Sequence, residues 1–138
     1  MTAYIDTSAL LRLVLREPGA LEDLQSSDAL VSNELIAVES ARTIDRLRLQ
    51  GALTVEEAAA RLRAVTEWLE AIDLVLLRPP VLSRASQPLP IPLGTPDAIH
   101  LASALIWRER MGVLSTMATH DNALGLAART FGFDVRGL

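Results

Sequence analysis

Four acidic residues stand at positions from which their side chains could act together: Asp6, Glu39, Asp97 and Asp121. Clustered carboxylates raise one another's pKa, so such a cluster is costly unless a cation neutralises it. The chain has no cysteine and no closely spaced histidine pair, which leaves oxygen ligands and favours a hard ion, Mg²⁺ or Mn²⁺. These ions orient water and neutralise charge on a phosphoryl group, so the acids predict metal-dependent phosphodiester hydrolysis.

Each aspartate of this set also has an ordinary structural interpretation. Asp6 and Asp121 could cap the helices that follow them, because aspartate is a favoured N-cap residue. Asp97 could be an acid that the helix dipole favours in a first turn. Glu39 is harder to explain in this way, because it interrupts the apolar side of its helix between Val38 and Ala41. The capping and the metal-binding interpretations both remain open for the aspartates.

Other polar residues near the acids are candidates for supporting roles. His100 and His120 lack the i,i+4 spacing of zinc-binding helices, so we expect both to be structural. Four hydroxyl side chains are expected to hold the acids or the waters of a metal ion: Thr7, Ser8, Ser32 and Thr119.

The elements that must position the acids alternate between short apolar runs and helical patterns. The apolar runs predict strands at 3–5, 29–32, 72–77, 113–119 and 133–135. Helical spacing and end signals predict helices over 7–16, 20–24, 33–50, 54–71, 81–86, 95–111 and 122–131. This alternation predicts a single α/β domain with a mostly parallel sheet. Strand carboxyl ends and helix N-termini share one edge of such a sheet, so we expect the acids to meet there.

Three helix starts have recognisable caps in the sequence. Ser32 is expected to cap the helix after the second strand, and Thr95 the helix in which Pro96 takes the first position. Thr54 and Glu57 form a capping box, which opens the second helix of an antiparallel helical hairpin.

The composition limits the kind of protein this is. A chain of 138 residues without cysteine is long enough for one domain with a core that needs no disulfide. The net charge of -4 argues against non-specific adhesion to nucleic acid, and all 13 basic residues are arginine. No segment resembles a signal peptide or a membrane span, so we expect a soluble cytoplasmic protein. Half of the residues are hydrophobic, and the helices around Leu47, Val65 and Leu69 are expected to contact a partner.

Four motifs occur in a familiar order and spacing: YIDTSALL, VES within a helix, TPDAIHLASAL and ATHDNAL. Together they resemble the PIN-domain ribonucleases, and specifically the VapC toxins of toxin-antitoxin pairs, over nearly the whole chain. The resemblance implies a five-stranded sheet of order 3-2-1-4-5 and Mg²⁺ or Mn²⁺ bound by the four acids. It also implies cleavage of RNA, a homodimer and inhibition by a VapB-like antitoxin. The arginines expected to bind RNA are Arg12, Arg16 and Arg42.

Other classes of protein share part of this pattern. A phosphotransfer receiver needs a lysine near its acyl phosphate, and this chain has none. A haloacid-dehalogenase-type phosphatase needs a second aspartate where Ser8 stands. A PIN scaffold that only binds a partner is a non-enzymatic alternative, although the presence of all four acids argues against it. A housekeeping RNA-processing nuclease remains open beside the toxin.

Overall fold

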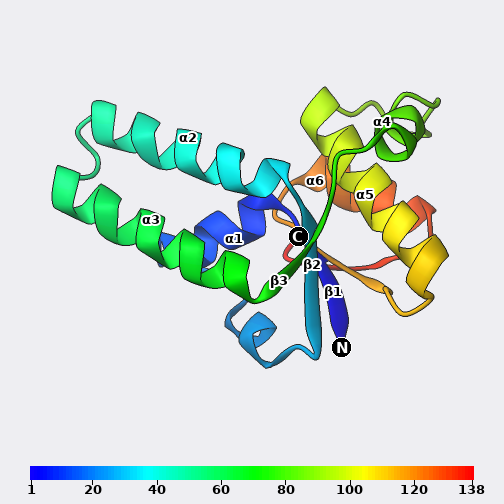
Figure 1. The fold of residues 1–138 in the computed structure, drawn as a ribbon, viewed down its shortest axis with the longest axis horizontal. Coiled ribbons are helices and arrows are strands. Elements are labelled where there is room, and N and C mark those ends of the chain that lie inside the picture. The colour runs from blue at the N-terminus through cyan, green and yellow to red at the C-terminus, as the bar shows by residue number, and fades with distance from the viewer.

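A five-stranded sheet forms the centre of the computed structural model, which describes the whole chain from residue 1 to residue 138. All its strands run parallel, in the order β3-β2-β1-β4-β5. The strands are β1 (Thr2–Ile5), β2 (Ala29–Asn33), β3 (Ile72–Val75), β4 (Thr116–Ala118) and β5 (Asp134–Arg136). The expected α/β architecture and strand order are therefore confirmed, with β1 in the middle of the sheet (Figure 1).

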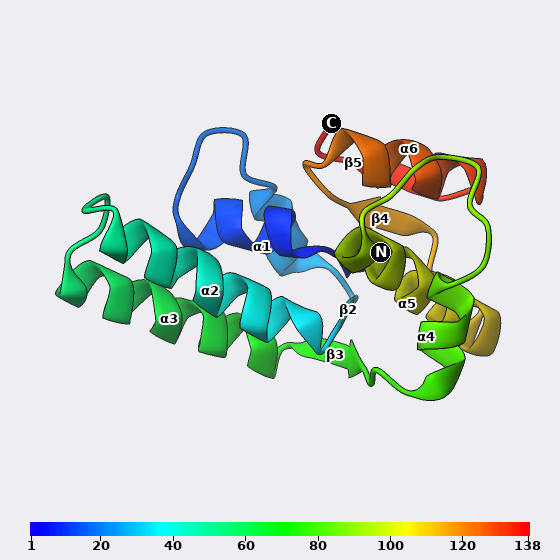
Figure 2. The same cartoon turned by 90° about the horizontal axis from the view of Figure 1, so that it is seen from above.

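Helices cover both faces of this sheet (Figure 2). One face carries α1 (Thr7–Val14), α2 (Leu35–Leu49) and α3 (Val55–Glu70). The other carries α4 (Pro79–Ala85), α5 (Thr95–Met111) and α6 (Asn122–Thr130). The short helix expected at 20–24 is a 3₁₀ helix at Glu22–Ser26. None of the helices combines the length and hydrophobicity that crossing a lipid bilayer would require.

The middle strand is buried on both of its faces. Ala3 and Ile5 pack into the core on the side of α1, α2 and α3, whereas Tyr4 packs into the core formed with α5 and α6. All three residues have no exposed surface. The apolar run before Asp6 is therefore a strand covered on both faces, as the sequence predicted. Its carboxyl end can be reached only from the edge of the sheet.

The helices α2 and α3 form the expected antiparallel hairpin, which extends beyond the sheet (Figure 1). The capping box is present, since Thr54 Oγ1 accepts from the Glu57 amide at 3.1 Å and Glu57 Oε1 accepts from the Thr54 amide at 3.1 Å. The helices around Leu47, Val65 and Leu69 remain a predicted partner contact, but two of these side chains face the core of this chain. Val65 is buried and Leu69 packs against the same core, because this face of α3 covers the sheet.

Two of the expected helix caps are also wrong. The strand β2 continues to Asn33, so Ser32 lies within it and its hydroxyl donates to the Ile5 carbonyl at 2.7 Å. Asn33 supports the start of α2 instead, through Oδ1, which accepts from the Leu35 amide at 2.9 Å. Thr95 is already helical and makes no capping bond, because the extended residue before α5 is Gly94.

Two strands are shorter than the apolar runs that predicted them. The run at 72–77 leaves the sheet after Val75, because its partner β2 ends at the paired residue Asn33. The run at 113–119 pairs only from Thr116 to Ala118, where β1 lies on one side and β5 on the other. An apolar run thus predicts a strand, but the neighbouring strands determine its length.

Candidate active site

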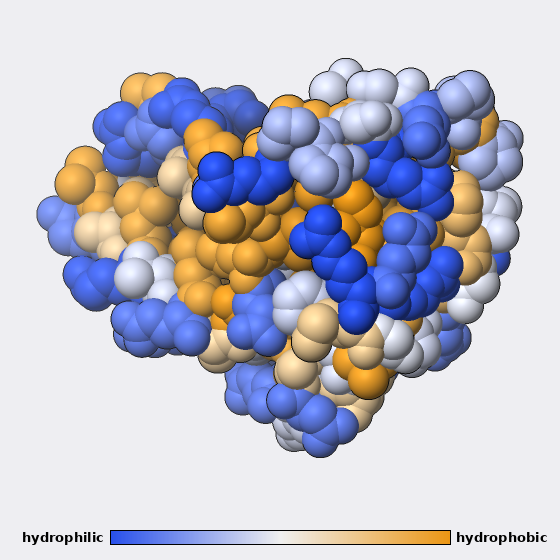
Figure 3. Space-filling view, turned by 45° about the vertical axis from the view of Figure 1, so that its right-hand side comes forward, coloured by the Kyte–Doolittle hydropathy of each residue, from blue (hydrophilic) through white to orange (hydrophobic).

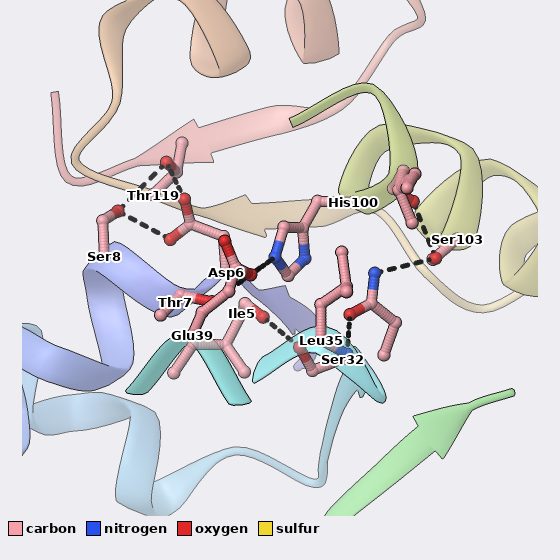
Figure 4. Close-up of polar contacts among 12 residues, drawn as sticks. Ile5, Asp6, Thr7, Ser8, Ser32, Leu35, Glu39, His100, Ser103 and Thr119 are labelled. Carbon is pink, nitrogen blue, oxygen red and sulfur yellow. Dashed lines mark hydrogen bonds and ion pairs between the residues drawn. The ribbon is translucent and has the colours of Figure 1, made fainter. Parts of the chain in front are cut away.

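Asp6 lies at the carboxyl end of the middle strand, directly before α1 (Figure 4). It is only 3% exposed, and both of its carboxylate oxygens accept hydrogen bonds. Oδ1 accepts from the Ser8 hydroxyl at 2.7 Å and from the Ala9 amide at 3.0 Å, and Oδ2 accepts from the Thr119 hydroxyl at 2.7 Å. Asp6 therefore caps α1, which is the structural role that the sequence left open.

These hydrogen bonds do not fully offset the burial of Asp6. Burial raises the pKa of this carboxyl group, and the bonds from Thr119, Ser8 and Ala9 lower it by less. The ionised form thus keeps part of its desolvation cost after accepting three hydrogen bonds. A bound cation would relieve that cost.

Glu39 reaches the same region from the second turn of α2 (Figure 4). Its Oε1 accepts from the hydroxyl of Thr7, the neighbour of Asp6, at 2.8 Å. The same oxygen lies 2.7 Å from Nε2 of the buried His100. Burial opposes the ionisation of Glu39, but His100 and Thr7 together outweigh it and lower the pKa of this carboxyl group. Glu39 is therefore held as a carboxylate.

Asp97 approaches from the first turn of α5. Burial raises its pKa, and repulsion from Asp121, Asp6 and Glu39 raises it further, to about 6. No hydrogen bond contributes to this pKa in the opposite direction. The other three acids therefore lie close enough to Asp97 to hinder its ionisation, so the fold brings all four predicted acids into one electrostatic environment.

Asp121 joins the site from the loop between β4 and α6. Its Oδ1 accepts from the Leu124 amide at 2.8 Å, so Asp121 caps α6. Its own amide donates to the hydroxyl oxygen of Thr119 at 3.0 Å. Because Thr119 also donates to Asp6, one threonine connects the two capping aspartates.

The donor set fits a hard divalent cation that keeps much of its own water. No three Asp, Glu, His or Cys side chains lie close enough together to form a preformed metal-binding cluster. Mg²⁺ commonly binds proteins through one or two carboxylates and several waters, so it does not need such a cluster. Burial and neighbouring acids raise the pKa of Asp97, and this repulsion indicates negative charge that a cation would neutralise. The pKa of Asp6 is raised by burial.

Three of the four predicted supporting hydroxyls contact an acid of the site. Thr7 donates to Glu39, and Ser8 and Thr119 donate to Asp6. Ser32 does not, because it donates to the Ile5 carbonyl within the sheet. His120 has a structural contact, with Nδ1 at 2.7 Å from the Gly137 carbonyl oxygen.

The three predicted RNA-binding arginines lie on α1, just after it and on α2. Arg12 and Arg16 are at the far end of α1, with Arg12 Nε 4.0 Å from Glu17. Arg42 lies one turn beyond Glu39 on α2 and pairs with Asp45 at 3.2 Å. None of the three forms an ion pair with a site acid.

Sequence reasoning missed the buried partners of Glu39. His100 was expected to be structural, yet it contacts Glu39 on one side and the Tyr4 hydroxyl, at 2.8 Å, on the other. One signal for this was available, because His100 follows Asp97 by three residues and therefore shares its helix face. The contact with Tyr4, 96 residues away, had no sequence signal.

Comparisons with known proteins agree with this architecture. The family model described as PIN domain matches residues 3–122. The chain is 36% identical to Ribonuclease VapC46 of Mycobacterium tuberculosis, over 96% of this chain and 94% of that protein. It is 34% identical to Ribonuclease VapC47 of the same species, over 94% of this chain and 92% of that protein.

A solved structure shares the fold at much lower sequence identity. PAE2754 from Pyrobaculum aerophilum superposes with a TM-score of 0.58 at 17% identity, covering 98% of this chain and 89% of that one. The family match spans most of the chain, and the curated relatives align along nearly all of it. The chain therefore belongs to the PIN-domain family, among its VapC-type members.

Proposed function

We propose that this chain is an endoribonuclease that acts as the toxin of a toxin-antitoxin pair and hydrolyses RNA phosphodiester bonds with Mg²⁺ or Mn²⁺. The observation that carries the proposal is the environment of Asp97, whose pKa of about 6 reflects burial and three neighbouring acids. An uncompensated acidic site of this kind is suited to a divalent cation. The similarity to VapC46 and VapC47, both named ribonucleases, supports RNA as the substrate.

The residues of the site have separable tasks in this function. Asp6, Glu39, Asp97 and Asp121 would hold the ion, which supplies charge neutralisation at the phosphate and an oriented water. Ser8 and Thr119 orient the Asp6 carboxylate, and Thr7 orients that of Glu39. Asp97 has no such partner, so its carboxylate is the acid most dependent on the cation. Arg12, Arg16 and Arg42 remain the proposed contacts to the RNA backbone.

The proposed partners are a VapB-like antitoxin and a second copy of the chain. Large apolar side chains that remain exposed support an association surface, and they include Val38, Leu74, Leu76 and Met111. Apolar side chains also gather in a band between hydrophilic rims on the face drawn in Figure 3. Patches of this kind are typical of protein contacts.

These partners predict that the chain is not a monomer in solution. Sedimentation at micromolar concentration is expected to show a dimer, and the product of an adjacent small reading frame is expected to bind it and to suppress RNA cleavage. A monomer that binds no such product would contradict the toxin assignment and leave the housekeeping nuclease as the better interpretation.

The acids predict a metal-dependent RNA cleavage activity that single substitutions abolish. Asp6→Asn and Asp97→Asn are each expected to lower cleavage by at least about two orders of magnitude, because a displaced ion no longer orients its water. The assay uses a panel of structured RNAs with Mg²⁺ or Mn²⁺. Asp73→Asn, at an exposed position of β3, is the matched control and should retain full activity. Full cleavage by the parent protein in EDTA would contradict the proposal.

Metal binding also predicts a difference in stability between parent and variant. Mg²⁺ at ten times its Kd is expected to raise the unfolding free energy of the parent by about 1.4 kcal/mol. Asp97→Asn should gain less from Mg²⁺, yet be at least as stable as the parent in EDTA, since it removes a repelled carboxylate. Thermal melts of both proteins with EDTA and with Mg²⁺ measure this. Equal metal-induced shifts would exclude Asp97 as a ligand.

The raised pKa of Asp97 predicts how metal-free stability depends on pH. The folded protein binds this proton with a pKa of about 6, whereas the ordinary value is 3.8. Ionised Asp97 therefore destabilises the fold at neutral pH, and this penalty is relieved as the pH falls from about 6 towards the ordinary value of 3.8. The stability advantage of Asp97→Asn over the parent in EDTA should shrink over that range in denaturant titrations. An advantage that is independent of pH would be inconsistent with a raised pKa.

A further inference from the structure

A row of three polar side chains, Tyr4, His100 and Glu39, leads from the protein interior to the acidic site. The Tyr4 oxygen is 2.8 Å from His100 Nδ1, and His100 Nε2 is 2.7 Å from Glu39 Oε1. Tyr4 has no exposed surface and His100 is 1% exposed. The two rings meet edge to face, with an interplanar angle of 77°. Each ring nitrogen thus has a different partner, on opposite sides of the imidazole.

The chemistry of Glu39 determines which ring nitrogen carries the proton. An ionised glutamate can only accept a hydrogen bond, so Nε2 must be the protonated nitrogen that donates to it. In the neutral ring Nδ1 then has a free lone pair. A tyrosine hydroxyl carries its proton at neutral pH, so that of Tyr4 donates to Nδ1. The opposite tautomer would place two acceptors 2.7 Å apart in a buried position.

This arrangement engages one oxygen of Glu39 twice and leaves the other available. Oε1 accepts from His100 Nε2 and from the Thr7 hydroxyl, at 2.7 Å and 2.8 Å. We propose that Tyr4 and His100 are positioning residues: the Tyr4 hydroxyl fixes the His100 ring through Nδ1, and His100 with Thr7 holds Oε1 so that Oε2 is presented to the divalent cation. This proposal rests on the proposed function, since it assigns Glu39 to metal binding. Partners of metal-binding carboxylates tune the affinity in this way in other sites.

The first experiment reads the tautomer of His100 in the metal-free parent by ¹⁵N NMR of the imidazole rings at about pH 8, above the ordinary pKa of histidine, about 6.5. His100 is expected to carry its proton on Nε2. His120 is an internal reference for the opposite tautomer, because its Nδ1 must carry the proton to donate to the Gly137 carbonyl. A His120→Asn variant assigns the two sets of signals. A His100 ring protonated on Nδ1 would overturn the proposal, whether or not any variant folds.

The second experiment compares Tyr4→Phe with the parent. This change removes one hydroxyl and keeps the ring. It is expected to shift the His100 Nδ1 signal, because that nitrogen loses its hydrogen-bond donor, while the proton stays on Nε2 and His120 is unchanged. Binding of Mn²⁺, measured by calorimetry, should weaken about tenfold. Thr116→Val is the matched control, because Thr116 is a buried hydroxyl residue at the opposite end of its strand from the site. It should bind Mn²⁺ as the parent does.

The outcomes separate this proposal from the function on which it rests. A parent that binds no Mn²⁺ would overturn the metal-dependent function, and the positioning role with it. A parent that binds Mn²⁺, together with a folded Tyr4→Phe variant of equal affinity, would overturn only the role of Tyr4 and His100. Loss of affinity in Thr116→Val as well would assign the effect to general loosening of the fold and would also overturn the positioning role.

Discussion

The burial of a carboxylate at the end of the middle strand is the constraint on which the rest of the structure depends. Asp6 follows a strand covered on both faces, and it is 3% exposed. Three donors from two parts of the chain converge on it, yet burial still raises its pKa. The surrounding elements must therefore supply the hydrogen bonds that offset the desolvation of this carboxylate. They must also leave it accessible to the cation that would neutralise it.

Capping and chemistry are not competing explanations in this site. Asp6 and Asp121 each accept an amide hydrogen bond at a helix start, and Thr119 connects the two. A cap positions a carboxylate rigidly at the edge of the sheet, where the strand has just ended. In the function we propose, the same hydrogen bonds that begin α1 and α6 hold the ligands of the metal ion. The acids differ in how their carboxylates are stabilised. Neighbouring acids repel the carboxylate of Asp97, and no hydrogen bond offsets this repulsion.

The site also depends on layers of contacts behind the acids. Glu39 is oriented by Thr7 from α1 and by His100 from α5, two helices on opposite faces of the sheet. Tyr4 reaches His100 from the middle strand itself. These residues are hidden from any ligand, so they act on chemistry only through Glu39. Membership of the PIN-domain family accounts for the strand order, whereas this row of polar side chains follows from the residues that the present chain places there.

The sequence by itself determined the order of elements, the parallel sheet and the edge at which four acids meet, because local periodicity and end signals are encoded in neighbouring residues. It did not determine where strands end, since β3 stops where its partner β2 stops. Nor did it identify Asn33 in place of Ser32 at the start of α2, or the contact of Tyr4 with His100. The tertiary structure alone decided these features, because a hydrogen bond between residues 96 positions apart depends on packing rather than on sequence spacing.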